Sequence, residues 1–269
     1  MIVKKFTARI ARAVGASALG ALLLSACLGN ATPSDTPRHR AQAAAAAAPS
    51  SAFAQCREFF ARQQPPAIAS AGHLRPLCYD AFAVLHNGNT RTPVFVAQRL
   101  NQALVADADE KRTNKFFADA RLPRAERAEL SDYKGSGYSR GHMAPAADMP
   151  TAQAMAQSFS LANMVPQSIK QNSGPWARIE KDTRRYASRA RGDVFVITGP
   201  VYREGAATVG SNRVGVPDYL FKLVYDAHTN RAWAHWQANR DDERISAPIS
   251  YAELVRRTGI EFLPGLQPQ

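Results

Sequence analysis

Ser139–Asp148 reads SRGHMAPAAD and places a histidine beside an arginine where the chain bends. The neutral imidazole of His142 can accept a proton near physiological pH. The guanidinium of Arg140 can bind an anionic oxygen through charge-assisted hydrogen bonds. Because short motifs also occur by chance and a single histidine is more often structural than catalytic, this stretch needs support from elsewhere in the chain.

A second group of polar residues follows downstream, in Asn163–Gln167 (NMVPQ) and at Asn172, Glu180 and Arg184. Asn172–Pro175 is typical of a helix start, and Glu180 and Arg184, four residues apart, would share one face of that helix. Side chains suited to burial then recur at helical spacing, at Trp176, Ile179, Thr183 and Tyr186. The two stretches together predict a strand, a loop and a helix that carry the polar groups.

These groups match the requirements of phosphodiester hydrolysis, namely an activated water, a cation and side chains that position the phosphate. His142 is the candidate general base. Mg²⁺ takes hard oxygen ligands and keeps several waters, so the amide oxygen of Asn172 can be its only direct protein ligand, and Mn²⁺ could replace it. Glu180 would hold the metal-bound waters, and Arg140 and Arg184 would bind phosphate oxygens.

Each of these residues also has an ordinary structural explanation. His142 could be a core histidine, and Asn172 could cap a helix. Glu180 and Arg184 could form an exposed ion pair worth about 0.3–0.5 kcal/mol. Their occurrence together, in this order, favours the catalytic interpretation.

The surrounding sequence predicts an α+β fold with a mostly antiparallel central sheet flanked by helices. Asp193–Tyr202 is apolar on both alternations, which indicates a strand buried on both faces. Tyr219–Tyr225 and Arg231–Gln237 flank a turn and predict an antiparallel pair. Thr151–Phe159 and Ser250–Thr258 are expected to be helices.

Two further elements are expected upstream of the histidine motif. Phe82–Leu85 reads as a strand, and the turn Asn87–Asn89 follows it. Thr92 and Pro93 are typical of the cap and first residue of a helix, which is expected to run to about Val105.

Residues 1–26 have the three parts of an export signal, which are a basic start, an apolar run and small residues before a cysteine. The tetrad Leu24-Ser25-Ala26-Cys27 is similar to a bacterial lipobox, so Cys27 is expected to be lipidated in an exported cell-envelope lipoprotein. In enteric bacteria, an aspartate directly after the lipidated cysteine retains a lipoprotein in the inner membrane. This chain has Leu28 at that position, which favours anchoring in the outer membrane. An ordinary secretory signal would instead leave the protein periplasmic or secreted. Residues 27–55 are rich in Ala, Pro and Ser and predict a tether.

The two remaining cysteines, Cys56 and Cys78, are expected to form a disulfide because an exported protein folds under oxidising conditions. Such a bond contributes about 3 kcal/mol in the chain-entropy account. Two buried free thiols are the alternative. Residues 56–269 are expected to form one globular domain.

The composition agrees with a globular protein that binds an anionic partner. The chain has 269 residues, of which 45% are hydrophobic, and a formal net charge of +12. This excess suits a nucleic acid or an anionic membrane surface, although it could also follow the composition of the genome. Arg112, in the basic and aromatic segment Lys111–Phe117, is a candidate phosphate contact. A zinc site is not indicated, because the other histidines lack ligand spacing; they are His39, His73, His86, His228 and His235.

Taken together, the motifs resemble the DNA/RNA non-specific endonuclease family, whose members carry a ββα-metal (His-Me finger) site. The resemblance rests on Arg140–His142, on Asn163–Gln167, and on Asn172 followed by Trp176 and Glu180. It implies a Mg²⁺-dependent enzyme that cuts both DNA and RNA. Attack by a histidine-activated water, with the 3′-oxygen leaving, predicts 5′-phosphate and 3′-hydroxyl ends.

The resemblance also implies roles for single residues. His142 would be the general base, Asn172 the magnesium ligand and Glu180 the acid that holds its waters. Arg140 would stabilise the transition state, and Asn163 would brace the site.

One position departs from the family's usual motif, because Ser139 stands where an aspartate is typical. Arg184, one turn past the glutamate, would contact phosphate.

Two other functions stay open. One is a non-catalytic envelope lipoprotein that binds nucleic acid, and the other is a phosphodiesterase that acts on lipid or cell-wall phosphates. A broad basic groove favours the nuclease, whereas a narrow apolar pocket favours the second alternative.

Replacement of Cys27 by serine tests the expected lipid anchor. The wild-type protein should partition with membranes and carry lipid mass on its N-terminal residue. Cys27→Ser should be released from membranes or keep its signal sequence, because serine has no thiol to acylate. Membrane fractionation and mass spectrometry of the N-terminus measure both results, and a soluble wild-type protein without lipid would contradict the anchor.

Overall fold

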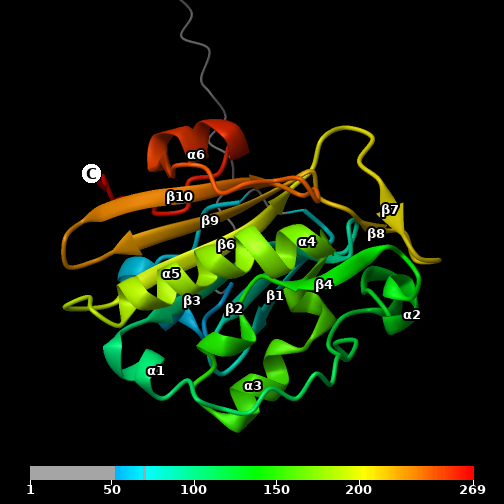
Figure 1. Ribbon diagram of the computed structural model, residues 1–269, viewed down its shortest axis with the longest axis horizontal. Helices are drawn as coiled ribbons and strands as arrows, with labels where there is room; N and C mark the ends of the chain where they lie inside the picture. The colour runs from blue at the N-terminus through cyan, green and yellow to red at the C-terminus, as the bar shows by residue number, and fades with distance from the viewer. Residues whose placement is uncertain (1–51, 69–70) are drawn as a thin grey trace, which may run out of the picture. The chain divides into compact units, whose positions relative to one another are not determined.

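The computed structural model describes residues 52–68 and 71–269, and Figure 1 shows how their helices and strands are arranged. The expected signal peptide (residues 1–26), Cys27 and most of the expected tether lie outside these residues. Phe53, at the end of that tether, is buried in the core, so packed structure begins upstream of residue 56. No helix within the described ranges is long and apolar enough to cross a membrane.

An antiparallel sheet forms the centre of the fold, with seven strands in the described part of the chain (Figure 1). Their order is β1-β2-β3-β6-β9-β10-β11, and every neighbouring pair is antiparallel. The strands are β1 Leu74–Cys78, β2 Ala83–Asn87, β3 Thr92–Leu100, β6 Val194–Val201, β9 Tyr219–Asp226, β10 Arg231–Ala238 and β11 Ile249–Ser250. The predicted α+β fold with a mostly antiparallel sheet is confirmed.

Both faces of this sheet are buried. On β6, Phe195 packs into the core that α6 (Tyr251–Thr258) covers, whereas Val196 packs on the opposite face with α5 (Ala177–Ala187). Successive side chains of a strand point to opposite faces, so a strand between two layers needs apolar residues at both alternations. The prediction of a strand buried on both faces is confirmed for β6.

A separate two-stranded ribbon, β4 (Tyr138–His142) paired with β5 (Met164–Ser168), lies on the α5 side of the sheet. Val165 of β5 and Ile179 of α5 belong to the same hydrophobic core. The ribbon and α5 together form the expected ββα unit.

The other elements are short. They are η1 Arg57–Phe59, η2 Ala61–Gln63, α1 Gln102–Ala106, η3 Arg124–Glu126, α2 Leu130–Tyr133, η4 Ala146–Asp148, α3 Ala152–Ser158, η5 Leu161–Asn163, α4 Ile169–Gln171, the π-helical turn η6 Asn172–Trp176, and the hairpin of β7 Thr208–Val209 and β8 Val214–Gly215. Thr151 caps α3 and Ser250 caps α6 through side-chain hydrogen bonds. Both helices therefore begin at the residues that the sequence predicted.

The helix predicted from Thr92 to Val105 is wrong, because β3 occupies most of this segment and α1 only its end. Val96 and Ala97 are buried in cores on opposite faces of the sheet, as a strand between two layers requires. Pro93 is tolerated beside a β-bulge, where the register between β2 and β3 shifts.

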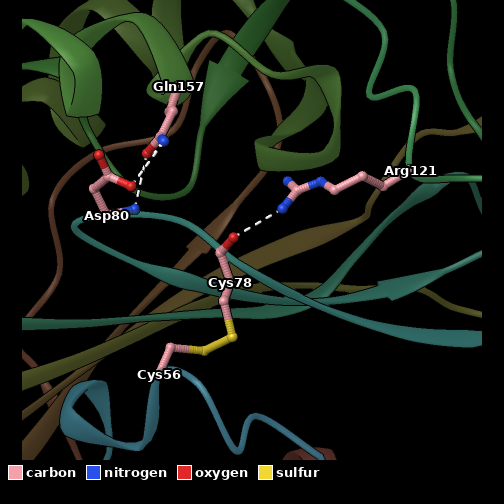
Figure 2. Close-up of a disulfide and its surroundings, with 5 residues drawn as sticks. All are labelled: Cys56, Cys78, Asp80, Arg121 and Gln157. Carbon is pink, nitrogen blue, oxygen red and sulfur yellow. Dashed lines mark hydrogen bonds between the residues drawn. A yellow bond between two sulfur atoms is a disulfide. The ribbon is translucent and has the colours of Figure 1, made fainter.

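Cys56 and Cys78 are joined by a disulfide, with Cα atoms 5.7 Å apart (Figure 2). Cys78 ends β1, and its carbonyl oxygen accepts a hydrogen bond of 2.8 Å from Arg121 Nη1. Asp80, just beyond the strand, accepts a hydrogen bond of 2.9 Å from Gln157 of α3, as Figure 2 also shows. The disulfide therefore ties the first turns of the domain to an edge of the sheet that is itself fixed to α3.

Removal of this disulfide is expected to lower the free energy of unfolding by about 3 kcal/mol, because an open loop has more conformations in the unfolded chain. The closed loop has a sequence separation of 22 residues. Urea unfolding of the paired Cys56→Ser and Cys78→Ser variant measures this loss, and reduction of the wild-type protein should reproduce it. Equal midpoints for the oxidised wild type and the paired variant would show that the bond does not stabilise the domain.

Candidate active site

His142 is the last residue of β4 and lies between two aromatic rings. Its ring packs edge-on against Phe159, with centroids 5.1 Å apart, and lies 5.9 Å from Phe116. The side chain is buried, and its Nε2 atom has no hydrogen-bond partner among the described residues. The unpaired Nε2 atom leaves one ring nitrogen free to accept a proton, a feature that His86 Nδ1 and His235 Nδ1 share.

Burial, together with a smaller effect of the positive charge of Arg112, lowers the pKa of His142 to about 3. The imidazole is therefore neutral at physiological pH. A neutral ring has one nitrogen that can accept a proton, which is the state that a general base requires.

Asn163 fixes the chain directly after His142. Its Oδ1 atom accepts a hydrogen bond from the Ala144 amide, and its Nδ2 atom donates to the carbonyl oxygens of Ala144 and Ser158, each at 2.9 Å. Its own carbonyl accepts a hydrogen bond of 3.0 Å from the Met143 amide. The residue is fully buried, so these bonds hold the bend after β4 in one conformation.

Asn172 begins the π-helical turn that leads into α5. Its Nδ2 atom donates to Ser139 Oγ at 3.1 Å, and Ser139 Oγ donates to the carbonyl of Gln167 at 2.9 Å. This chain of bonds orients the amide and leaves its Oδ1 atom as the group that can ligate a cation. Ser139, at the position where the family usually has an aspartate, thus connects β4, β5 and the start of the helix.

A pocket of about 490 Å³ lies against β4 and is mostly polar, basic and aromatic. It is lined by Arg112, Phe116, Leu130, Tyr133, Lys134, Tyr138, Ser139, Arg140 and Asn172. The guanidinium of Arg140 stacks 4.1 Å from the Phe116 centroid, and that of Arg112 lies 5.0 Å from Phe159. Because the same two rings contact His142, both arginines lie close to the candidate base.

A buried group of charges lies between α5 and the sheet. Lys222 of β9 is only 1% exposed, and its Nζ atom donates to Thr198 Oγ1 at 2.7 Å and lies 5.4 Å from the Trp176 ring centroid. It interacts electrostatically with Glu180 and Asp148. Sequence reasoning missed Lys222, because a single lysine belongs to no motif. The available signal was that Lys222 lies in a strand where its neighbouring residues are apolar on both faces, so that its charge has to be buried.

Glu180 lies on α5 beside this lysine. Burial raises the pKa of Glu180 to about 7, while the positive charge of Lys222 acts in the opposite direction. Asp148 raises this pKa and Arg184 lowers it, by smaller amounts. The carboxyl group is therefore poised to change its charge near neutrality when a cation approaches.

Arg184 is held by an ion pair. Its Nη1 atom lies 2.8 Å from Asp148 Oδ1, and the two side chains are 22% and 5% exposed. The exposed pair of Glu180 with Arg184 that the spacing allowed is not formed. A phosphate that binds Arg184 would therefore share the guanidinium with Asp148.

The donor atoms at this site fit Mg²⁺. Among residues 52–68 and 71–269, no group of three or more His, Cys, Asp or Glu side chains could hold a metal ion. An oriented amide oxygen from Asn172 instead suits a hard cation that keeps most of its waters.

Comparison with known proteins agrees with this geometry. The sequence profile of the DNA/RNA non-specific endonuclease family matches residues 66–269. Mitochondrial nuclease EXOG of Danio rerio is 32% identical over 211 residues, which are 71% of this chain and 61% of that protein. Nuclease C1 of Cunninghamella echinulata is 32% identical over 201 residues, which are 70% of this chain and 79% of that protein. The chain belongs to the DNA/RNA non-specific endonuclease family.

A solved structure shares the fold. One chain of the EndoG/EndoGI complex matches with a TM-score of 0.66 at 22% identity, over 82% of this chain and 94% of that chain. Mitochondrial endonuclease G of Homo sapiens is 31% identical over 210 residues, which are 71% of this chain and 67% of that protein. The chain spans only 42% to 61% of the length of the EXOG proteins that it matches.

Glu180→Gln tests the raised pKa of Glu180 without a change in side-chain size. The pKa is about 7 in the folded protein against an ordinary value of 4.5. As the pH rises above 4.5, the unfolded chain releases this proton while the folded protein keeps it until about pH 7. The free energy of unfolding contributed by the protonated carboxyl is therefore complete below pH 4.5 and is lost as the pH rises through 7. With EDTA present, the unfolding free energy of the wild type should fall by about 3 kcal/mol relative to Glu180→Gln between pH 4.5 and 8. Urea unfolding across this range measures the difference, and parallel profiles would refute the shift.

Proposed function

We propose that this protein is a Mg²⁺-dependent endonuclease that hydrolyses phosphodiester bonds in both DNA and RNA. The observation that carries the proposal is the neutral, buried His142 beside a basic pocket, with an oriented Asn172 lining the same pocket. Family membership and the nuclease relatives support the same activity.

His142 acts as the general base, taking a proton from the attacking water. Arg140 and Arg112 bind the phosphate oxygens, and their stacking on Phe116 and Phe159 restricts the guanidinium planes before substrate arrives. Arg140 also stabilises the negative charge that develops in the transition state.

Asn172 Oδ1 would ligate Mg²⁺, and Glu180 would accept hydrogen bonds from the water ligands of the ion. When bound, the ion supplies positive charge for the leaving oxygen. Ser139 holds the Asn172 amide in position. Lys222 lowers the pKa of Glu180 and so favours the carboxylate that can accept those hydrogen bonds.

None of these roles uses the sugar 2′-hydroxyl, so DNA and RNA should both be cut. A water nucleophile with a 3′-oxygen leaving group gives 5′-phosphate and 3′-hydroxyl ends. Contacts to phosphate carry little sequence information, so base preference should be weak. Digestion of plasmid and RNA with and without EDTA, followed by end-group analysis, tests the whole proposal, and products with 3′-phosphate would refute the mechanism.

The pocket favours a nuclease over a phosphodiesterase for lipid or cell-wall phosphates. Arg112, Lys134 and Arg140 give its lining three basic side chains beside polar and aromatic ones. A lipid substrate would instead require an apolar pocket. A protein that only binds nucleic acid has no use for an unpaired, neutral histidine next to the phosphate site.

We further propose that the enzyme is exported and anchored to the cell envelope, in the outer membrane, through Cys27. The lipobox-like tetrad Leu24–Cys27 supports this location. The disulfide of Cys56 and Cys78 also supports it, since disulfides persist in oxidising compartments.

His142→Ala is expected to reduce turnover about 10²- to 10⁴-fold, the usual contribution of a general base. Binding of nucleic acid should change little, because the arginines carry the affinity for the ground state. Plasmid cleavage and fluorescence anisotropy measure the two effects.

His86→Ala is the matched control for this variant. His86 is also a buried histidine, but its Nε2 atom is hydrogen-bonded to the Glu126 carbonyl at 2.7 Å. The folded fraction of His86→Ala should keep wild-type turnover. Wild-type turnover in His142→Ala would mean that another group is the base.

A further inference from the structure

A second pocket, of about 290 Å³, shares the side chain of Tyr138 with the active-site pocket. Tyr138 begins β4, the strand that ends in His142. The two pockets therefore meet at one wall. Arg203, Tyr219 and Arg240 also line the second pocket.

The second pocket is fixed to the active-site ribbon. Asn239, which lines it, accepts a hydrogen bond of 2.7 Å from the Ser168 amide and donates one of 3.0 Å to the Pro166 carbonyl. It also donates to the carbonyl of Pro217 at 2.9 Å. Ser168 lies opposite Tyr138 in the β4–β5 ribbon, so hydrogen bonds of the Asn239 side chain to the β5 backbone set the spacing between the two pockets.

Arg203 and Tyr219 line the second pocket, and Trp236 packs against the Tyr219 ring. The rings of Trp236 and Tyr219 lie 5.2 Å apart at an interplanar angle of 33°, and the Arg203 guanidinium lies 4.8 Å from the Tyr219 centroid. Arg203 is exposed, whereas Tyr219 is partly buried. The Arg203 guanidinium also donates a hydrogen bond to the Tyr219 hydroxyl, so Tyr219 holds an exposed guanidinium plane in place.

We propose that this pocket binds an unpaired nucleotide of the substrate strand, next to the one that is cleaved, with its base stacked on the Arg203 guanidinium. The inference rests on the proposed nuclease function. Unstacked bases bind aromatic rings and arginine planes, and such stacking tolerates any base. A base inside a duplex is already covered on both faces, so the occupant is single-stranded or locally opened.

The charges around the pocket agree with a base subsite more than with a phosphate clamp. Arg240 is paired with Asp242 at 3.2 Å and with Glu243 at 3.3 Å. Asp218 also lines the pocket, and its carboxylate accepts a hydrogen bond from the Arg203 amide at 2.8 Å. The Asp218 carboxylate would repel a phosphate group in this pocket, but it would not repel an uncharged base.

Arg203→Lys separates stacking from charge, because lysine keeps the charge and lacks the plane. In full-length protein that carries His142→Ala, we compare binding of a twelve-residue oligothymidylate with that of an equally long abasic strand by fluorescence anisotropy. Arg203→Lys should weaken binding of the thymidylate about tenfold, which matches the contribution of one stacked base. Binding of the abasic strand should change less than about twofold, because it offers no base to stack.

Arg256→Lys is the matched control, since Arg256 is an exposed arginine of α6 that pairs with Glu253 and lines neither pocket. It should bind both strands as the His142→Ala parent does. Equal loss for both strands in Arg203→Lys, or no loss for either, would overturn the base subsite and leave the nuclease proposal intact. A parent protein that binds neither strand would overturn both proposals.

Discussion

The buried charges between α5 and the sheet constrain the rest of the site. Burial lowers the pKa of Lys222 and raises the pKa of Glu180, so each group is pushed toward its neutral form. Their attraction opposes this, and the pair formed by Arg184 and Asp148 adds a second cation and a second carboxylate. Ions removed from water are stable only when their partners stay close. The charges therefore fix α5 against β9.

The ββα unit divides the chemistry between elements of different rigidity. The ribbon holds His142, and the packing of its two strands depends on Gly141, because a Cβ atom there would lie 1.8 Å from Gln167 Oε1. No larger residue fits between Arg140 and His142 while Gln167 keeps its place. The helix supplies Glu180, and its π-helical first turn supplies Asn172. The proposed base and the proposed cation ligand thus come from separate elements, which the Asn172–Ser139 hydrogen bond joins.

The sequence predicted what depends on local pattern and missed what depends on distant partners. The strand β6 and the helix α5 followed from the sequence pattern. Asn172 lines the active-site pocket, whereas His142 does not line it and contacts the Phe116 and Phe159 rings beside it. The helix expected at Thr92 failed because a local cap signal cannot show that β2 and β6 pair with this segment. Lys222 and the Asp148 partner of Arg184 were missed for the same reason, since only the folded chain brings them to α5.

Ser139 shows how the site accommodates a departure from the family's usual motif. Its hydroxyl accepts a hydrogen bond from Asn172 and donates one to the Gln167 carbonyl. An ionised aspartate could accept the first bond but has no hydrogen for the second. Serine therefore satisfies both neighbours and leaves the pocket with one fewer negative charge. By charge alone, an aspartate at this position would attract a divalent cation more strongly, and repel a polyanion more strongly, than serine does.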